Sequence, residues 1–155
     1  MDLKRFLREE TLARVGYRPL VSIRPEATIA QAVETMRASN VGCVLVVASA
    51  KLCGIFTERD LVTRVLAVGR SLEEPVSAVM TPEPAVAREQ EPICQVLSRM
   101  HAGGYRHLAV VGESGQPLGT VSVKRVAGFI ADHYHRAVCN LPPEPHQYGH
   151  AREGA

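Results

Sequence analysis

Apolar and polar positions alternate in blocks along this chain, and the block from residue 20 to residue 66 predicts one strand, helix, strand, strand, helix unit. Its first extended piece ends before Arg24-Pro25, because the residue before a proline avoids helical backbone. Thr28 and Gln31 then form a capping-box sequence, which predicts the start of a helix. An apolar stripe spaced i, i+3, i+4 and i+7 gives that helix one buried face: Ile29, Ala32, Val33 and Met36.

Two strands and a second helix are predicted next. The uninterrupted apolar run 41–47 indicates a strand buried on both faces, and the run 52–56 indicates a second strand after a turn. Thr57 is expected to cap the following helix, since threonine is favoured at that position. The apolar stripe of this helix consists of Leu61, Val62, Val65 and Leu66.

The same pattern returns in the second half of the chain, which indicates an internal repeat. Residues 85–88 match 21–24 at an offset of 64, and the strand 107–111 matches 43–47 at the same offset. After one extra loop residue the offset becomes 65, and 119–122 falls on 54–57. We therefore predict an α/β (α+β) fold of two tandem β-α-β-β-α repeats with pseudo-two-fold symmetry, with the sheets packed together and the helices outside.

The predicted boundaries follow from where this pattern starts and stops. Residues 1–14 are expected to form an amphipathic helix that packs on another surface, such as a partner subunit. The first repeat takes residues 15–70, a charged linker 71–82 and the second repeat 83–138. Residues 139–155 contain three prolines and few apolar residues, so we expect a disordered tail.

Composition and charge narrow the classes of function. The 155 residues include 18 Lys and Arg against 16 Asp and Glu, and the formal net charge of +2 gives no indication of a nucleic-acid-binding surface. No apolar run reaches the roughly 20 residues of a membrane span, and the charged N-terminus is unlike a signal peptide. We therefore expect a cytoplasmic protein with no membrane or nucleic-acid partner. The four cysteines lack a CxxC spacing, which favours reduced, structural thiols.

Candidate binding chemistry lies at the corner between the second strand and second helix of the first repeat. Thr57, Arg59 and Asp60 place a hydroxyl, a cation and a carboxylate within four residues. Free N–H groups in a helix's first turn attract phosphate, and a carboxylate beside them accepts hydrogen bonds from a ribose diol. A structural interpretation stays open, because a Thr cap contributes about 1 kcal/mol and an acid at the helix start about 0.3–1 kcal/mol.

Two such corners at the repeat spacing resemble the CBS domain pair, a regulatory module named after cystathionine β-synthase. The resemblance spans about residues 15–136 and rests on Gly54–Asp60, Gly119–Arg125 and the segment 74–81. It implies a non-catalytic module that binds an adenosine-containing ligand (AMP, ADP, ATP, NAD or S-adenosylmethionine) in clefts between the repeats. It also implies homodimers, a regulated protein partner and no cofactor other than the regulatory nucleotide.

Carried over to this chain, the resemblance assigns Thr57, Arg59 and Asp60 to ribose and phosphate in one cleft. Ser122 and Lys124 take the matching positions in the other cleft. There, Arg125 replaces the ribose-binding carboxylate, so this cleft is expected to hold a ligand differently or to stay empty.

Residues of the middle strands complete the candidate sites. Two cations in a first turn favour a bound phosphate, and an Arg fork suits phosphate as well, so we group four residues as a second, phosphate-binding site: Arg106, His107, Ser122 and Lys124. The alternative is that they are solvated surface residues. Tyr105 is expected either to stack on adenine or to cover the sheet. Val41, Gly42 and Ile23 either line an adenine slot or only pack within the strands.

Metal and catalytic sites are not predicted. The potential metal ligands near the C-terminus are His133, His135, Cys139, His146 and His150. The first two are spaced i, i+2 and do not share a helix face. No nucleophile and base pattern indicates an enzyme. The predicted function is a stand-alone module that senses an adenosine-containing ligand, and the alternative is a structural dimerisation module without a nucleotide.

Overall fold

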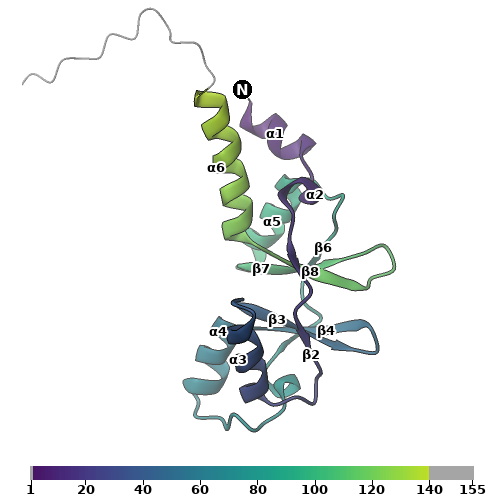
Figure 1. The fold of residues 1–155 in the computed structure, drawn as a ribbon, viewed down its shortest axis with the longest axis vertical. Helices are drawn as coiled ribbons and strands as arrows, with labels where there is room; N and C mark the ends of the chain where they lie inside the picture. The colour runs from purple at the N-terminus through teal and green to yellow at the C-terminus, as the bar shows by residue number, and fades with distance from the viewer. Residues whose placement is uncertain (1, 140–155) are drawn as a thin grey trace, which may run out of the picture.

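The computed structural model describes residues 2–139 and contains two four-stranded sheets that lie between helices (Figure 1). The strands are β1 (Arg18–Pro19), β2 (Ser22–Ile23), β3 (Cys43–Ala48), β4 (Lys51–Thr57), β5 (Thr81–Pro82), β6 (Val86–Ala87), β7 (His107–Val111) and β8 (Pro117–Ser122). The helices are α1 (Leu3–Glu9), α2 (Leu12–Val15), α3 (Ile29–Ala38), α4 (Glu58–Asp60), the π-helix η1 (Leu61–Leu66), the 3-10 helix η2 (Val76–Ala78), α5 (Ile93–Gly103) and α6 (Val123–Cys139). The predicted α+β fold of two tandem repeats is confirmed.

The helix predicted from Thr28 is α3, and its capping box forms as expected. The Thr28 hydroxyl accepts from the Gln31 N–H at 3.1 Å, and the Gln31 side chain accepts from the Thr28 N–H at 3.0 Å. Ile29, Ala32 and Met36 are buried on the side that faces the sheet. The local sequence therefore specifies both where this helix begins and which face it buries.

The helix after Thr57 differs from the regular one that was predicted. It begins as one α-turn, α4, and continues as the π-helix η1, where Ala67 N–H donates to the Val62 carbonyl five residues earlier. The wider turn changes the angular spacing of side chains. As a result Val65 is fully buried, whereas Val62 and Leu66 are 56% and 61% exposed, so the prediction of one continuous apolar stripe is wrong.

Two short strands cross between the sheets: β1 of the first repeat joins the sheet of the second repeat, and β5, in the predicted linker, joins the sheet of the first. The two sheets have the orders β2-β3-β4-β5 and β1-β8-β7-β6, so β1 pairs with β8 and β5 pairs with β4. Glycines lie at both crossings: Gly119 faces Pro19, and Gly54 faces Pro82. A Cβ at Gly119 would overlap the Arg18 carbonyl oxygen, so only glycine permits this approach of the two backbones.

Three apolar clusters fill the space on and between the sheets. One cluster lies between α3 and the first sheet, and a second between α5, α6 and the other sheet. The third joins the two sheets through Cys43, Leu45 and Ile55 of one and Ala109 of the other. These residues are at most 6% exposed, so the predicted packing of sheet on sheet is present.

The N-terminal segment is two helices that complete the second repeat. Glu10 and Thr11 are extended and interrupt the single helix that was predicted, and Thr11 pairs with Pro92. Phe6 of α1 stacks on His133 of α6 with ring centroids 3.9 Å apart, and Leu12 of α2 is 1% exposed in the second core. The expected packing surface is thus the chain's own second repeat rather than a partner subunit.

Residues 76–82, within the predicted linker, play the equivalent part for the first repeat. Val76 and Val79 are buried in the first core, and Pro75 pairs with Thr28 as Thr11 pairs with Pro92. The two segments are related by the same offset of 64 that relates the repeats. Of the predicted tail, only Cys139, at the end of α6, belongs to the described residues.

Candidate functional site

A cavity of about 300 Å³ lies between the first corner and the second repeat. From the first repeat it is lined mainly by residues 57–60 with Gly42, Ile55 and Arg64, and from the second by Pro84, Ala85 and residues 103–107. We call it the first cleft. Two carboxylates, Glu58 and Asp60, and three arginines, Arg59, Arg64 and Arg106, are among its lining residues.

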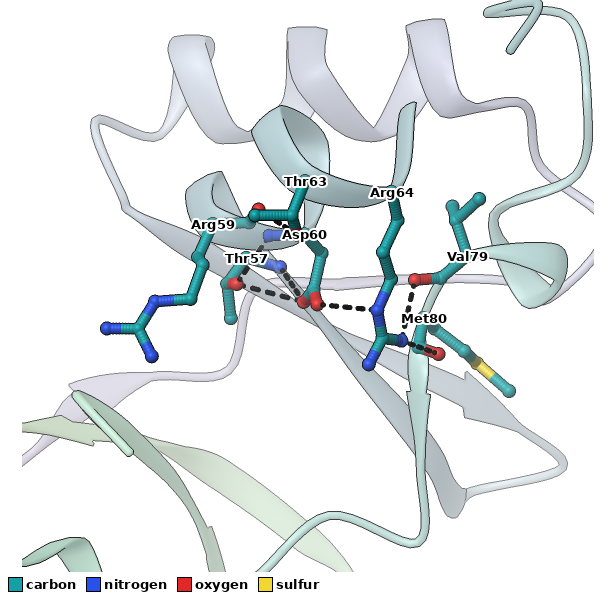
Figure 2. A network of polar contacts seen from close by, with 7 residues as sticks. All are labelled: Thr57, Arg59, Asp60, Thr63, Arg64, Val79 and Met80. Atoms are coloured by element: carbon teal, nitrogen blue, oxygen red, sulfur yellow. Dashed lines mark hydrogen bonds and ion pairs between the residues drawn. The ribbon is translucent and has the colours of Figure 1, made fainter. Parts of the chain in front are cut away.

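Asp60 lines the first cleft, and it forms a reciprocal cap with Thr57 (Figure 2). The Thr57 hydroxyl accepts from the Asp60 N–H at 3.2 Å. Asp60 Oδ2 in turn accepts from the Thr57 N–H at 3.0 Å and from the Thr57 hydroxyl at 2.9 Å. Asp60 is only 7% exposed. Together with Thr57, the N-terminal cap residue, it forms the capping box at the start of α4. The corner therefore contains the helix cap that the structural interpretation predicted, and this cap forms without a ligand.

Arg64 connects Asp60 to the segment that leads into the second repeat. Its Nε lies 3.4 Å from Asp60 Oδ1, and its Nη1 donates to the carbonyl oxygens of Val79 at 3.2 Å and Met80 at 2.9 Å (Figure 2). Sequence reasoning missed Arg64. Its position four residues after Asp60, on the same helix face, is the signal that could have identified it.

Arg59 bridges the two repeats at the first cleft. Figure 2 shows its side chain directed away from the Asp60 and Arg64 pair. Its Nη1 donates to the Gly104 carbonyl at 3.2 Å, and Gly104 has the left-handed backbone (φ 66°) that ends α5. Arg59 thus contacts the second repeat through neutral backbone, and its charge has no acidic partner within residues 2–139.

Arg106 lines the first cleft and His107 lines both clefts, which corrects the predicted assignment of Arg106. They face the Thr57 corner because α4 of the first repeat begins opposite the start of β7 in the second. The grouping of Arg106 with Ser122 and Lys124 is wrong, since those two residues line another cavity. Tyr105 lines the first cleft too and is 42% exposed.

His107 lines both cavities and lies beside Gly42 at the point where the repeats meet. A Cβ at Gly42 would lie 3.4 Å from His107 Cε1 and 3.5 Å from Glu58 Oε2. Burial lowers the pKa of His107, the Glu58 carboxylate opposes that change, and the Arg106 cation adds to it. Near pH 7, the His107 imidazole that lines both clefts is therefore largely uncharged.

The second cleft is a cavity of about 360 Å³ on the other side of His107. Its lining residues are Arg18, Asn40, Val41, Gly42, Cys43, His107, Thr120, Ser122, Lys124 and Arg125. Ser122 caps α6 by accepting from the Arg125 N–H at 3.2 Å. Arg125 Nε donates to the Gly16 carbonyl at 3.1 Å. Burial raises the pKa of the Cys43 thiol to about 11, so that thiol stays protonated.

The remaining predicted residues fall in different places. Val41 lines the second cleft, and Gly42 lines both. Ile23 lines neither cleft, because its side chain packs against the first core, so the structure does not support its assignment to an adenine slot. Among residues 2–139 no three potential metal ligands lie together. His146 and His150 are outside the described residues.

Comparison with known proteins decides the family. The CBS domain matches this chain twice, over residues 13–67 and 76–132. The chain belongs to the CBS domain family. An uncharacterized 17.7 kDa protein from Acidianus ambivalens is 32% identical to this CBS pair over 111 residues, which cover 71% of this chain and 66% of that protein. The chain also matches longer CBS domain-containing proteins from Arabidopsis thaliana, of which it spans 22–23%.

Solved structures share the fold of this CBS pair. A CBS domain protein from Pyrobaculum aerophilum complexed with AMP matches with a TM-score of 0.74 at 22% identity, over 83% of this chain and 99% of that one. The CBS domain pair of protein MJ0100, in complex with 5′-methylthioadenosine and S-adenosyl-L-methionine, matches with a TM-score of 0.72 at 20% identity, over 80% and 98% of the two chains. At these identities the likeness establishes the fold alone.

The described helices give no indication of a membrane span. Within residues 2–139 none is both long enough and apolar enough to cross a bilayer.

Proposed function

We propose that this CBS pair is a regulatory, non-catalytic module that binds an adenosine-containing ligand in its first cleft. The observation that carries the proposal is the convergence of Asp60, Arg59 and Arg106 on one cavity from two repeats. AMP and S-adenosylmethionine are bound by proteins of the same fold. The cavity volume of about 300 Å³ lies at the lower end of the range for small-molecule sites, which favours a mononucleotide over a dinucleotide such as NAD.

Asp60 is suited to accept a ribose hydroxyl. A carboxylate offers about four acceptor positions. Two are taken, both on Oδ2 by Thr57, while Oδ1 has only the ion-pair contact with Arg64 Nε at 3.4 Å. A ribose hydroxyl can therefore bind Oδ1 without displacing a hydrogen bond, and two hydroxyls on Oδ1 would compete with Arg64 for the same oxygen. Recognition of a ribose diol thus draws on the contact between Asp60 and Arg64.

The other parts of a nucleotide have matching surfaces in the first cleft. Arg106 is exposed and forms no ion pair within residues 2–139, so its fork is available for phosphate oxygens. Arg59 supplies a second cation. Ile55, Pro84, Ala85 and the Tyr105 ring are the apolar lining that an adenine base requires.

In this proposal, Arg64 transmits ligand binding from Asp60 to the segment before β5. A ribose hydroxyl that competes for Asp60 weakens the hold of Arg64 on the Val79 and Met80 carbonyls, just before β5. The shift between the two arrangements is bounded by the ligand's differential affinity for them. A protein partner that senses segment 79–82 would receive the signal.

A homodimer is proposed on the exposed apolar face that follows Asp60. Val62, Leu66 and Val68 are 56%, 61% and 65% exposed, and Leu72 is 42% exposed. Large exposed apolar side chains on one segment favour an interaction surface. The cytoplasm is the proposed location.

One observation favours a second candidate function, a dimerisation module with no nucleotide. Asp60 and Thr57 satisfy each other within the protein, so the corner is complete as a helix cap without a ligand. This candidate predicts that nucleotides leave the thermal stability unchanged.

Thermal shift and calorimetry with AMP, ATP, NAD and S-adenosylmethionine test the proposal. A ligand at 100 times its Kd is expected to add about 2.7 kcal/mol of stability. The variant Arg106→Gln should weaken the phosphate-bearing ligands about tenfold while adenosine binds as before. Arg88→Gln, which removes an exposed arginine that lines neither cleft, is the matched control. Absence of binding by all four ligands would refute the proposal.

A further inference from the structure

The charge of the second cleft differs from that of the first. Its lining includes three cations, Arg18, Lys124 and Arg125, and no carboxylate. None of the three forms an ion pair with an acidic side chain within residues 2–139. Lys124 and Arg125 lie in the first turn of α6, where the helix dipole is positive and adds to their own charge. An anion in this cavity would remove an unfavourable concentration of positive charge.

The carboxylate is missing because Arg125 has a different structural task. Arg125 is the residue equivalent to Asp60, and its N–H donates to Ser122 as that of Asp60 donates to Thr57. Its side chain, however, donates to the Gly16 carbonyl. Gly16 is equivalent, at the offset of 64, to Met80, whose carbonyl accepts from Arg64 in the first repeat.

The same backbone carbonyl is therefore held by an arginine in both repeats, from two different helix positions. In the first repeat Asp60 orients Arg64, and that carboxylate is also available to a ligand. In the second repeat Arg125 reaches the carbonyl directly, so no orienting carboxylate is needed. A guanidinium has only donors and cannot accept from a ribose hydroxyl. The replacement of the carboxylate by Arg125 therefore removes ribose recognition from the second cleft and leaves its three cations.

We propose that the second cleft is an oxyanion site that takes phosphate or pyrophosphate and rejects nucleosides. Lys124 and the Ser122 hydroxyl bind the anion, and Arg125 supplies charge while it holds Gly16. The contrast with the first cleft rests on the proposed function, whereas the anion site stands on the second cleft alone. Each chain thus has one nucleoside site and one separate anion site.

Titration of the full-length chain with inorganic pyrophosphate, in saturating adenosine and at about 0.15 M salt, tests the anion site. Lys124→Gln is expected to weaken pyrophosphate binding about tenfold, because it removes a charge-assisted contact. Arg106→Gln in the first cleft and Arg88→Gln on the surface should leave that binding unchanged. Lys124 is exposed and forms no hydrogen bond through its side chain within the described residues, so its variant is expected to fold.

Several results would overturn the inference. One is no detectable binding of pyrophosphate. Another is a loss of pyrophosphate affinity in Arg106→Gln instead of Lys124→Gln. A third is an equal loss of affinity in Arg88→Gln, which would show that only net charge matters. Two AMP molecules per chain would also overturn it, while the proposed function would stand. Pyrophosphate binding that depends on Lys124, together with no binding of any adenosine-containing ligand, would support the anion site and refute the proposed function alone.

Discussion

Replacing Asp60 with alanine should reveal how much of the first corner's stability the carboxylate supplies in the absence of ligand. The substitution removes the acceptor for two donors of Thr57, its N–H and its hydroxyl, and it removes the acidic partner of Arg64. The Thr57 hydroxyl can turn to another acceptor, but the N–H cannot, since it is fixed by the backbone. The largest cost therefore comes from one partly buried N–H.

The magnitude follows from these contacts. A buried donor left without a partner costs about 1–3 kcal/mol, and loss of a reciprocal helix cap costs about 1 kcal/mol. The ion pair adds little, because the Arg64 side chain is 46% exposed and such pairs contribute about 0–1 kcal/mol. We expect Asp60→Ala to lose about 2–4 kcal/mol, which lowers the melting temperature by roughly 10 °C in a chain of this size.

Equilibrium unfolding in urea without nucleotide measures this loss. Glu58→Ala is the matched control, since it removes a carboxylate from the same helical turn that forms no hydrogen bond or ion pair within the described residues. At neutral pH, where His107 is largely uncharged, the control should cost mainly the interaction with the helix dipole, about 0.3–1 kcal/mol. If Asp60→Ala and Glu58→Ala destabilise the protein equally, the cap does not contribute as the geometry requires.

Three further predictions concern the strand crossing and two titrating groups. Gly119→Ala should destabilise the protein by about 1–3 kcal/mol in thermal unfolding, because the new Cβ meets the backbone of β1. Gly128→Ala, with open space around its Cβ, should stabilise α6 by about 0.5–1 kcal/mol. The opposite ranking of the two variants would contradict the strand crossing. The lowered pKa of His107 means that the unfolded chain, with a value near 6.5, binds more protons, so stability should fall as the pH drops from about 7 and level off below the folded pKa. His107→Gln should remove that part of the pH dependence of the urea midpoint, and an unchanged profile would refute the assignment. Iodoacetamide at about pH 8 should alkylate Cys53 before Cys43, whose pKa is raised to about 11, and mass spectrometry showing the reverse order would contradict its burial.

Much of the fold could be predicted because its signals are either local or repeated along the chain. Thr28 and Gln31 specify the start of α3, and the offset of 64 between the repeats reveals the tandem architecture. The exchanged strands β1 and β5 could not be predicted in the same way. Each has two residues and contains a proline, so neither shows an alternating pattern, and their partners are distant in sequence.

The role of the N-terminal segment could be predicted from the sequence only in part. The offset that relates the repeats also places Leu12 on Val76 and Val15 on Val79, and all four are buried in the two cores. Extending the comparison outside the obvious repeats would have assigned residues 11–16 to the second core. The break at Glu10 depends instead on pairing of Thr11 with Pro92, which no local pattern indicates.

The candidate site was predicted in its components but not in its grouping. Thr57, Arg59 and Asp60 do converge on one cavity, because the corner fixes them relative to one another. Arg106 was assigned to the wrong cleft, because it was grouped with Ser122 and Lys124 of the same repeat as a phosphate-binding set, whereas His107 lines both clefts. Pseudo-two-fold packing instead places the corner of one repeat opposite the middle strand of the other. Gly16 gained its role only from a contact that the fold creates, whereas the spacing of Arg64 from Asp60 was a signal in the sequence.

The central claim is that Asp60 recognises a ribose diol in the first cleft, and one comparison of ligands tests it without altering the protein. Calorimetry should be carried out with AMP and with 2′,3′-dideoxy-AMP, which keeps the base and phosphate but lacks both hydroxyls. We expect AMP to bind at one site per chain and the dideoxy nucleotide to bind at least about tenfold more weakly, as expected for loss of a hydrogen bond to a charged group. Equal affinities for the two nucleotides, or no binding of AMP, would contradict the claim.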